Sequence, residues 1–393
     1  MNKLRLLFLS YFFLLVGFFV YSFTQVDLGL TLSKFPAYQS LEKSLQYVGF
    51  YQRPLSAAIF IIIASLLFIF YASFLYLAKK GQLKLKTLTI LTVLTAVILG
   101  FSYNAFSYDL FNYIFDAKIV SYYHLNPYLY KASDFTSDPM LHFMRWTHRF
   151  YPYGPSWLIL TVPLTFIGMN YFLPTFLMFK ILMLASFLGS CYLIYKISAK
   201  LFPENKLLNL VFFAFNPLVL IETLISAHND MPMIFFILLS IYLFIQKKKI
   251  LSWVSNLFSI GIKFSTGALL PLFIIIEFFD RTNRRINWGK FFVSATILSL
   301  STVLLASIRT TFQPWYLVFP LSVATFVSSK KYISIPAIVA SIFAVVIYVP
   351  YILMTDYAKG YPQIIQDIEF IGVATVLIFL VIVLLYPRFS SKK

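Results

Sequence analysis

Apolar stretches of about 20 residues recur along the whole chain, and they limit the folds open to it. They are continuous runs of Leu, Ile and Phe without the two-residue alternation of strands. Backbone groups inside a bilayer must bond to one another, so only helices or a closed barrel can span it, and these runs favour helices. Charged residues make up 12% of the chain, against roughly 25% in soluble domains. The sequence therefore predicts an all-α polytopic membrane protein with a single transmembrane domain over residues 1–393.

About 11–13 transmembrane helices are expected. The first is predicted to be an uncleaved span, because no small-residue cleavage site follows it. The segment 156–169 is short and contains Pro163, which indicates a re-entrant or partly inserted helix. The candidate spans are 6–24, 55–78, 88–106, 171–195, 207–226, 231–246, 250–262, 264–279, 288–308, 317–329, 332–353 and 368–386.

The net charge of +18 is better explained by the orientation of such a protein in the membrane than by binding to nucleic acid. With both termini placed in the cytoplasm, most of the 32 Lys and Arg residues lie in short cytoplasmic loops, as the positive-inside rule requires. No soluble basic module is present that would bind nucleic acid. This orientation predicts that the long loop 107–155 faces the outside of the cell membrane, provided that 156–169 does not cross it.

The loop 107–155 holds four of the 14 acidic residues. Asp109 follows an apolar span directly, where its carboxylate could accept a proton from an approaching hydroxyl. It could equally cap a helix that begins at Leu110. Asp116 lies seven residues further on, so the two acids share one face if this segment is helical.

Aromatic residues and turns follow in the same loop. Asn126-Pro127-Tyr128 and Tyr151-Pro152-Tyr153-Gly154-Pro155 are typical of rigid turns. Their rings suit the C–H faces of a sugar, and they equally suit the membrane interface.

A second polar group comprises Glu222, His228 and Asp230, at the outer end of a predicted helical hairpin. Ionisable residues at such positions are costly and usually functional. The group could hold a divalent cation, or form a hydrogen-bonded turn that orients the histidine.

Two isolated cations, Lys263 and Arg309, are predicted near the outer leaflet. Each could bind a phosphate, or could extend to lipid headgroups. The polar, aromatic segment that contains Gln313, Trp315 and Tyr316 follows Arg309. The single cysteine, Cys191, excludes a disulfide framework, and no motif for nucleotide binding occurs, which argues against a nucleotide-sugar or ATP site.

These motifs together resemble the polyprenol-phosphate-mannose-dependent mannosyltransferases of the GT-C fold. The resemblance covers about residues 100–320. It rests on four short motifs in the family's order: Tyr108-Asp109-Leu110-Phe111-Asn112-Tyr113 with the two turns above, Asn216-Pro217-Leu218 through His228-Asn229-Asp230, Lys263, and Gln313-Pro314-Trp315-Tyr316. One departure is that Asp109 follows the third predicted span, whereas many GT-C enzymes carry the catalytic acid after the first.

The resemblance implies an inverting glycosyltransferase that moves a hexose, with mannose as the expected sugar, from a polyprenyl phosphate to an extracytoplasmic glycan or glycolipid acceptor. It implies that Asp109 is the general base and that neither a cofactor nor a metal is used. The substrate-binding residues expected are Asp116, Asn126, Tyr128, Tyr153, His228, Asp230, Lys263, Arg309, Gln313, Trp315 and Tyr316.

Two other functions stay open at this point. A transporter or flippase for lipid-linked saccharides would carry ionisable groups in mid-membrane and show repeated halves. A polysaccharide polymerase would depend on Arg and His in a large late outer loop, whereas the large polar loop here comes early.

Overall fold

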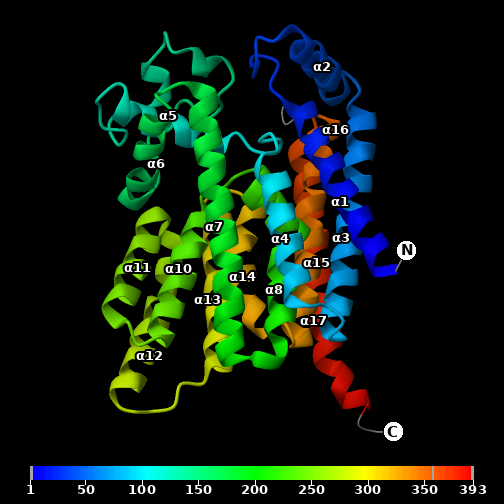
Figure 1. Ribbon diagram of the computed structural model, residues 1–393, viewed down its shortest axis with the longest axis vertical. Helices are drawn as coiled ribbons and strands as arrows, with labels where there is room; N and C mark the ends of the chain where they lie inside the picture. Colours follow the sequence, from blue (N-terminus) through cyan, green and yellow to red (C-terminus); the bar gives the residue numbers. More distant parts are fainter. Residues whose placement is uncertain (1–2, 356–357, 391–393) are drawn as a thin grey trace. The chain divides into compact units, whose positions relative to one another are not determined.

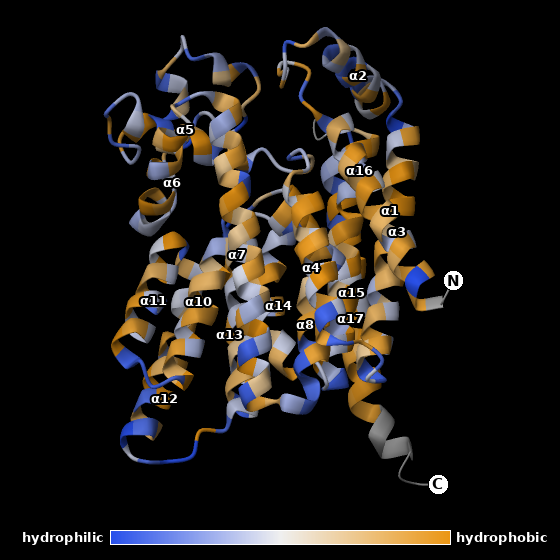
Figure 2. Cartoon of the chain, in the orientation of Figure 1, coloured by the Kyte–Doolittle hydropathy of each residue, from blue (hydrophilic) through white to orange (hydrophobic). Residues whose placement is uncertain are grey.

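The computed structural model describes residues 3–355 and 358–390, with the side chains of 3 and 386–390 excepted. Helices make up most of this part of the chain, and no strand occurs in it. This confirms the prediction of an all-α polytopic membrane protein. The hydropathy colouring of Figure 2 shows why: the long helices are mainly hydrophobic, and hydrophilic residues gather in the connecting loops and near helix ends.

Six of the described helices are long and apolar enough to cross a membrane, and a seventh span is possible if one bent pair of helices counts as one. Five further apolar helices are shorter, at 10–17 residues. The expected total of 11–13 spans includes these short helices and stays a prediction. The six long candidates are Leu4–Gln25, Arg53–Lys79, Phe172–Leu201, Trp288–Arg309, Lys331–Leu353 and Tyr361–Leu385.

The chain divides into two compact units, which are described separately; the division does not test the prediction of a single transmembrane domain. Unit 1 comprises residues 1–59, 91–190 and 221–264. Its helices, labelled in Figure 1, lie wholly or partly in these ranges. They are α1 (Lys3–Ser22), α2 (Pro36–Gln46), α3 (Arg53–Lys79), α4 (Leu85–Gly100), α5 (Asp109–Ser121), α6 (Pro155–Ile167), α7 (Phe172–Leu201), α10 (Asp230–Ile245) and α11 (Lys249–Ile262).

Unit 2 comprises residues 60–90, 191–220 and 265–393. It includes α8 (Lys206–Ala214), α9 (Pro217–Leu220), α12 (Leu270–Arg281), α13 (Trp288–Arg309), α14 (Val318–Ala324), α15 (Lys331–Val346), α16 (Tyr348–Leu353) and α17 (Tyr361–Ser390). Helix α17 packs on α15, and Gly372 allows that approach because a Cβ there would lie 3.0 Å from Phe343.

Within unit 1, α10 and α11 form a helical hairpin, and α11 also packs against α6 (Figure 1). Ser240 of α10 and Ser252 of α11 exchange hydroxyl-to-carbonyl hydrogen bonds of 2.7 and 2.8 Å. Gly154, just before α6, lies so close to Gly261 of α11 that a Cβ on it would come within 2.3 Å of the Gly261 carbonyl oxygen. The turn at 151–155 therefore needs glycine for close approach rather than for an unusual dihedral angle.

The part of the loop 107–155 that follows α5 is folded back onto this helix. The Asp138 carboxylate accepts hydrogen bonds from Lys118 of α5 and from Tyr123, the latter at 2.7 Å. Burial raises the pKa of Asp138, but these bonds lower it more, so that the net shift is downward and the acid stays ionised. The contacts hold the loop against α5 and fix the helix that begins at Asp109.

Candidate active site

Asp109 is the first residue of α5, and the N-cap position belongs to Tyr108. The Ser107 hydroxyl accepts a hydrogen bond of 3.1 Å from the Asp109 backbone N–H, which shapes the turn into the helix. A carboxylate in the first turn is favoured by the helix dipole. The Asp109 side chain is 20% exposed, so one edge of it can be reached from outside the protein.

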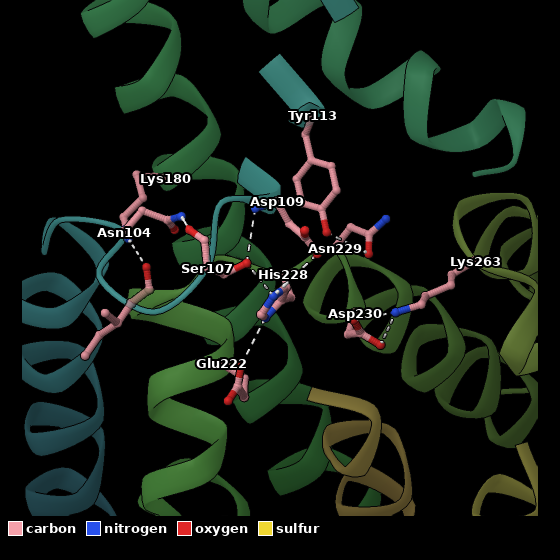
Figure 3. Close-up of polar contacts among 11 residues, drawn as sticks. Asn104, Ser107, Asp109, Tyr113, Lys180, Glu222, His228, Asn229, Asp230 and Lys263 are labelled. Carbon is pink, nitrogen blue, oxygen red and sulfur yellow. Dashed lines mark hydrogen bonds and ion pairs between the residues drawn. The ribbon is translucent and has the colours of Figure 1, made fainter. Parts of the chain in front are cut away.

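Behind Asp109 lies His228, whose side chain is fully buried (Figure 3). Its Nε2 atom is 3.0 Å from Ser107 Oγ and 3.7 Å from Asp109 Oδ2. Its Nδ1 atom is 3.0 Å from Oε2 of Glu222, another fully buried side chain. The imidazole ring therefore lies between two carboxylates, only one of which is accessible.

An irregular, fully buried segment positions His228. Residues Ile221–Ile225 form one π-helical turn, a feature that is frequent at functional sites. The chain then reverses at Ala227, whose φ of 56° is unusual for a residue other than glycine. The His228 N–H donates back to the Glu222 carbonyl oxygen at 3.0 Å, so Glu222 and His228 are fixed relative to each other.

Lys180 of α7 holds this turn from the other side. Lys180 is 1% exposed, and its Nζ atom donates to the carbonyl oxygens of Leu224 and, at 3.1 Å, of Ile225. A buried cation is costly unless it is well partnered. These hydrogen bonds from Lys180 hold in place the segment that joins Glu222 to His228.

Asp230 and Lys263 form an ion pair in the same unit (Figure 3). Lys263, at the C-terminal end of α11, donates to both carboxylate oxygens of Asp230 at 2.9 and 2.7 Å. Asp230 is the first residue of α10, two positions after His228. The structure therefore brings together two residues that the sequence singled out separately.

Aromatic rings run from the surface of the loop towards this group. The rings of Tyr128 and Tyr151 lie 5.0 Å apart, those of Tyr151 and Tyr153 5.7 Å, and those of Tyr153 and Tyr113 5.4 Å. The Tyr113 hydroxyl donates to Asn229 Oδ1 at 3.4 Å. Rings in edge-to-face series make a rigid wall, of the kind that can contact the C–H face of a sugar.

The outer end of this wall is held by Asn126, whose side chain accepts a 3.0 Å bond from the Tyr128 N–H, as in an Asx turn. Tyr128 is 43% exposed, and its hydroxyl donates to the Tyr153 carbonyl oxygen at 3.0 Å. Burial raises the pKa of Tyr113 and of Tyr153 well above the usual value, with a contribution from Asp109 in each case. Both phenols are therefore neutral hydrogen-bond donors.

Asp116 lies two turns along α5 from Asp109. Burial raises its pKa from 3.8 to about 8, and the charge of Asp109 adds to the rise. At neutral pH Asp116 is therefore protonated and can donate a hydrogen bond, unlike an ordinary surface aspartate.

The raised pKa of Asp116 makes folding stability depend on pH. Unfolded protein loses this proton near pH 4 and folded protein only near pH 8, so the wild type loses stability as the pH rises between these values. We expect Asp116→Asn, which imitates the protonated acid, to unfold at a higher temperature than wild type above pH 8. At pH 4 the two should unfold alike. Thermal unfolding in detergent at both pH values checks this. An equal difference at both would contradict it, and Asp134→Asn, in the exposed part of the same loop, is the control.

The remaining predicted site residues belong to unit 2. Arg309 is the exposed last residue of α13, and the side chain of Gln313 donates to the Thr311 hydroxyl at 3.0 Å. Trp315 packs edge-on against Tyr316, with 5.8 Å between ring centroids. The predicted part of Arg309, Gln313, Trp315 and Tyr316 in substrate binding stays a prediction.

Within residues 3–355 and 358–390 no group of three His, Cys, Asp or Glu side chains is arranged to hold a metal ion. Glu222 and His228 instead contact each other, and Asp230 is paired with Lys263. The contact between Glu222 and His228 is of the kind expected for a turn that orients the histidine, and the divalent-cation interpretation stays a prediction.

Several site residues were missed in the sequence. Ser107 precedes the motif around Asp109 and Tyr113 ends it, and neither was picked out. Glu222 was noted with His228 and Asp230 but was not among the expected substrate-binding residues. Lys180 gave a clear signal, because it is an ionisable residue in the middle of an apolar span.

The sequence matches the α-(1→6)-mannopyranosyltransferase family, N-terminal domain, over residues 15–278. The chain belongs to this family. This mannosyltransferase is a multi-pass membrane protein, with a lipid bilayer as its environment and sugars as its substrates. The matched range contains Asp109, Asp116, Glu222, His228 and Lys263 and ends before Arg309. Comparison with curated proteins and with solved structures gives no match.

Proposed function

We propose that this mannosyltransferase is a GT-C-type enzyme that takes mannose from a polyprenyl phosphate and transfers it to a glycan or glycolipid acceptor on the outer side of the membrane. Asp109 is the general base in this proposal. The observation that carries it is the position of Asp109: a carboxylate with one accessible edge, nine residues after the end of an apolar helix, backed by a buried imidazole.

A donor on a lipid carrier suits this position. Asp109 begins a helix nine residues after Gly100, the last residue of the apolar helix α4, so it lies close to the end of a hydrophobic segment. A polyprenyl-phosphate sugar has its reactive bond at the level of the lipid headgroups. The absence of any nucleotide-binding motif in the sequence points to the same class of donor.

The reaction requires a proton acceptor and groups that stabilise the negative charge on the departing phosphate. An attacking hydroxyl loses its proton as its oxygen bonds to the anomeric carbon, and a carboxylate can take it. Negative charge collects on the phosphate oxygen as the old bond breaks, and cations or hydrogen-bond donors stabilise it there. Besides Lys263, unit 1 offers Arg145, whose guanidinium stacks 4.4 Å above the ring of Tyr108, the residue before Asp109.

The family's product is an α-(1→6) mannoside. A single displacement inverts the anomeric carbon, so an α product requires a β-linked donor. The aromatic wall from Tyr128 to Tyr113 ends beside Asn229, next in the chain to His228, and is therefore the proposed surface for the sugar ring.

The test uses the purified full-length protein in proteoliposomes with a short α-mannoside acceptor. We expect radiolabelled mannose to move to the acceptor from β-linked polyprenyl-phosphate mannose and not from a nucleotide-diphosphate mannose. Transfer from the nucleotide donor, or none from the lipid donor, would overturn the proposal.

A further inference from the structure

Glu222, His228, Ser107 and Asp109 form a row that runs from the interior of unit 1 to the accessible edge of the site (Figure 3). Neither Glu222 nor His228 is exposed, Ser107 is buried, and only Asp109 is reachable. The ring lies 3.0 Å from Glu222 and 3.0 Å from Ser107, and a longer gap of 3.7 Å separates it from Asp109.

The charge of Glu222 fixes the orientation of the ring. A buried carboxylate is costly unless an opposite charge or a hydrogen-bond donor faces it. Nδ1 lies 3.0 Å from Glu222 Oε2, in an ion-pair contact without the alignment of a hydrogen bond, and the negative charge there favours the tautomer that carries its proton on Nδ1. In the neutral ring, Nε2 is then the nitrogen with a free electron pair, and it faces Ser107 and Asp109.

Other charged groups around His228 come from three further elements. Asp230 follows it in α10 and is neutralised by Lys263 of α11. Lys180 of α7 donates from Nζ to the carbonyl oxygens of Leu224 and Ile225, within the segment that joins Glu222 to His228. These groups hold the turn, whereas Glu222 and Asp109 face the two ring nitrogens themselves.

We propose that Glu222 and His228 form a proton-accepting dyad that serves Asp109; this rests on the proposed function. The acceptor oxygen bonds to the anomeric carbon, and the bond from that carbon to the phosphate oxygen breaks with its electron pair on the phosphate. The acceptor proton moves to Asp109, and from there to Nε2 of His228. The resulting imidazolium lies between two carboxylates, and Asp109 is again ionised.

This arrangement stabilises positive charge where it develops. A carboxylate behind the imidazole fixes its tautomer and stabilises the imidazolium, as the aspartate does in serine-protease triads. The gap of 3.7 Å between Nε2 and Asp109 exceeds a hydrogen bond, and catalytic bonds often tighten only when the substrate binds. The Ser107 hydroxyl, at 3.0 Å from the ring, can also relay the proton.

The test replaces Glu222 by Gln, which keeps the shape and removes the charge. In the proteoliposome assay we expect kcat to fall by about 10²-fold, within the range of acid–base catalysis, while KM for the lipid donor stays within about twofold. Because the imidazole then binds its proton less tightly, the rising limb of the pH–activity profile should move to lower pH.

Glu42→Gln is the matched control, because Glu42 is also a buried carboxylate of unit 1. It lies in α2 and accepts hydrogen bonds from the Thr31 hydroxyl and the Leu32 N–H. This variant should leave kcat and the pH profile unchanged. Glu222→Asp keeps the charge and should recover part of kcat with a wild-type pH profile; it serves as the test should Glu222→Gln fail to fold. A wild-type kcat and pH profile in Glu222→Gln would overturn the dyad. So would a Glu222→Asp variant whose pH profile moves to lower pH by as much as is expected for Glu222→Gln. Loss of the proposed function itself is recognised separately, by a wild type that transfers nothing or by a fully active Asp109→Asn variant.

Discussion

Replacing Asp109 by Asn should lower the kcat of mannosyl transfer by about 10³-fold. The amide has nearly the same shape as the carboxylate, and it cannot take the proton of the acceptor hydroxyl. Donor binding should change little, because Asp109 is assigned to proton transfer and not to the phosphate. Initial rates from β-linked polyprenyl-phosphate mannose in proteoliposomes, over a range of donor concentrations, give both constants.

The matched control for this variant is Asp134→Asn. Asp134 lies in the same loop, is exposed, and accepts a hydrogen bond of 3.0 Å from the Lys131 N–H. It should keep the wild-type rate. Equal losses in the two variants would mean that the loop, rather than the base, was damaged, and an Asp109→Asn variant with full activity would remove Asp109 from the mechanism.

Replacing Lys263 by Met should destabilise the protein by about 3 kcal/mol, because it leaves the carboxylate of Asp230 buried without its cation. Asp230 is 4% exposed and Lys263 21%, so solvent compensates little for the loss. Reversible unfolding in detergent measures the change. Lys34→Met, at an exposed position of the same unit, should alter the free energy of unfolding by less than about 0.5 kcal/mol.

The double variant Asp230→Asn/Lys263→Met separates two roles of Lys263. It removes both charges and should recover most of the lost stability. If Lys263 also binds the donor phosphate, KM for the lipid donor stays raised in the double variant although its stability has returned. A single variant as stable as wild type would show that the ion pair does not hold α10 and α11 together.

The sequence predicted the long helices well because the bilayer imposes one simple rule on them. The single span predicted over 207–226 was wrong, because the chain breaks there into Lys206–Ala214, Pro217–Leu220 and a π-helical turn. The apolar run predicted over 55–78 became Arg53–Lys79, and the one over 288–308 became Trp288–Arg309. In both cases basic residues end the run, and the helix extends to include them. The short apolar segment 156–169 became the helix Pro155–Ile167.

The site was harder to predict because its contacts join distant parts of the chain. Asp109 and His228 were both recognised, but nothing in the sequence places Ser107 against a histidine 121 residues away. The π-helical turn at 221–225 and the reversal at Ala227 arise from tertiary packing, and they determine that Glu222 faces the ring. The pairing of Asp230 with Lys263 is likewise a product of the α10–α11 hairpin.

Lys180 could have been predicted. An ionisable residue in the middle of an apolar span is costly and needs partners. The broken helix after Asn216-Pro217 supplies such partners, because an irregular turn leaves carbonyl groups outside regular hydrogen bonding. One can search each apolar span for a lone Lys or Arg, and then search for an interrupted helix whose carbonyl groups could accept its hydrogen bonds. Such a search would have connected Lys180 with the broken helix.

The configuration of the mannoside formed from a β-linked lipid donor tests the central claim most directly. Purified protein in proteoliposomes is given β-linked polyprenyl-phosphate mannose and an α-mannoside acceptor, and the anomeric carbon of the new bond is assigned by NMR before the product can be modified further. A single displacement with Asp109 as base predicts an α-linked product. A β-linked product, or no product from this donor, would contradict the account.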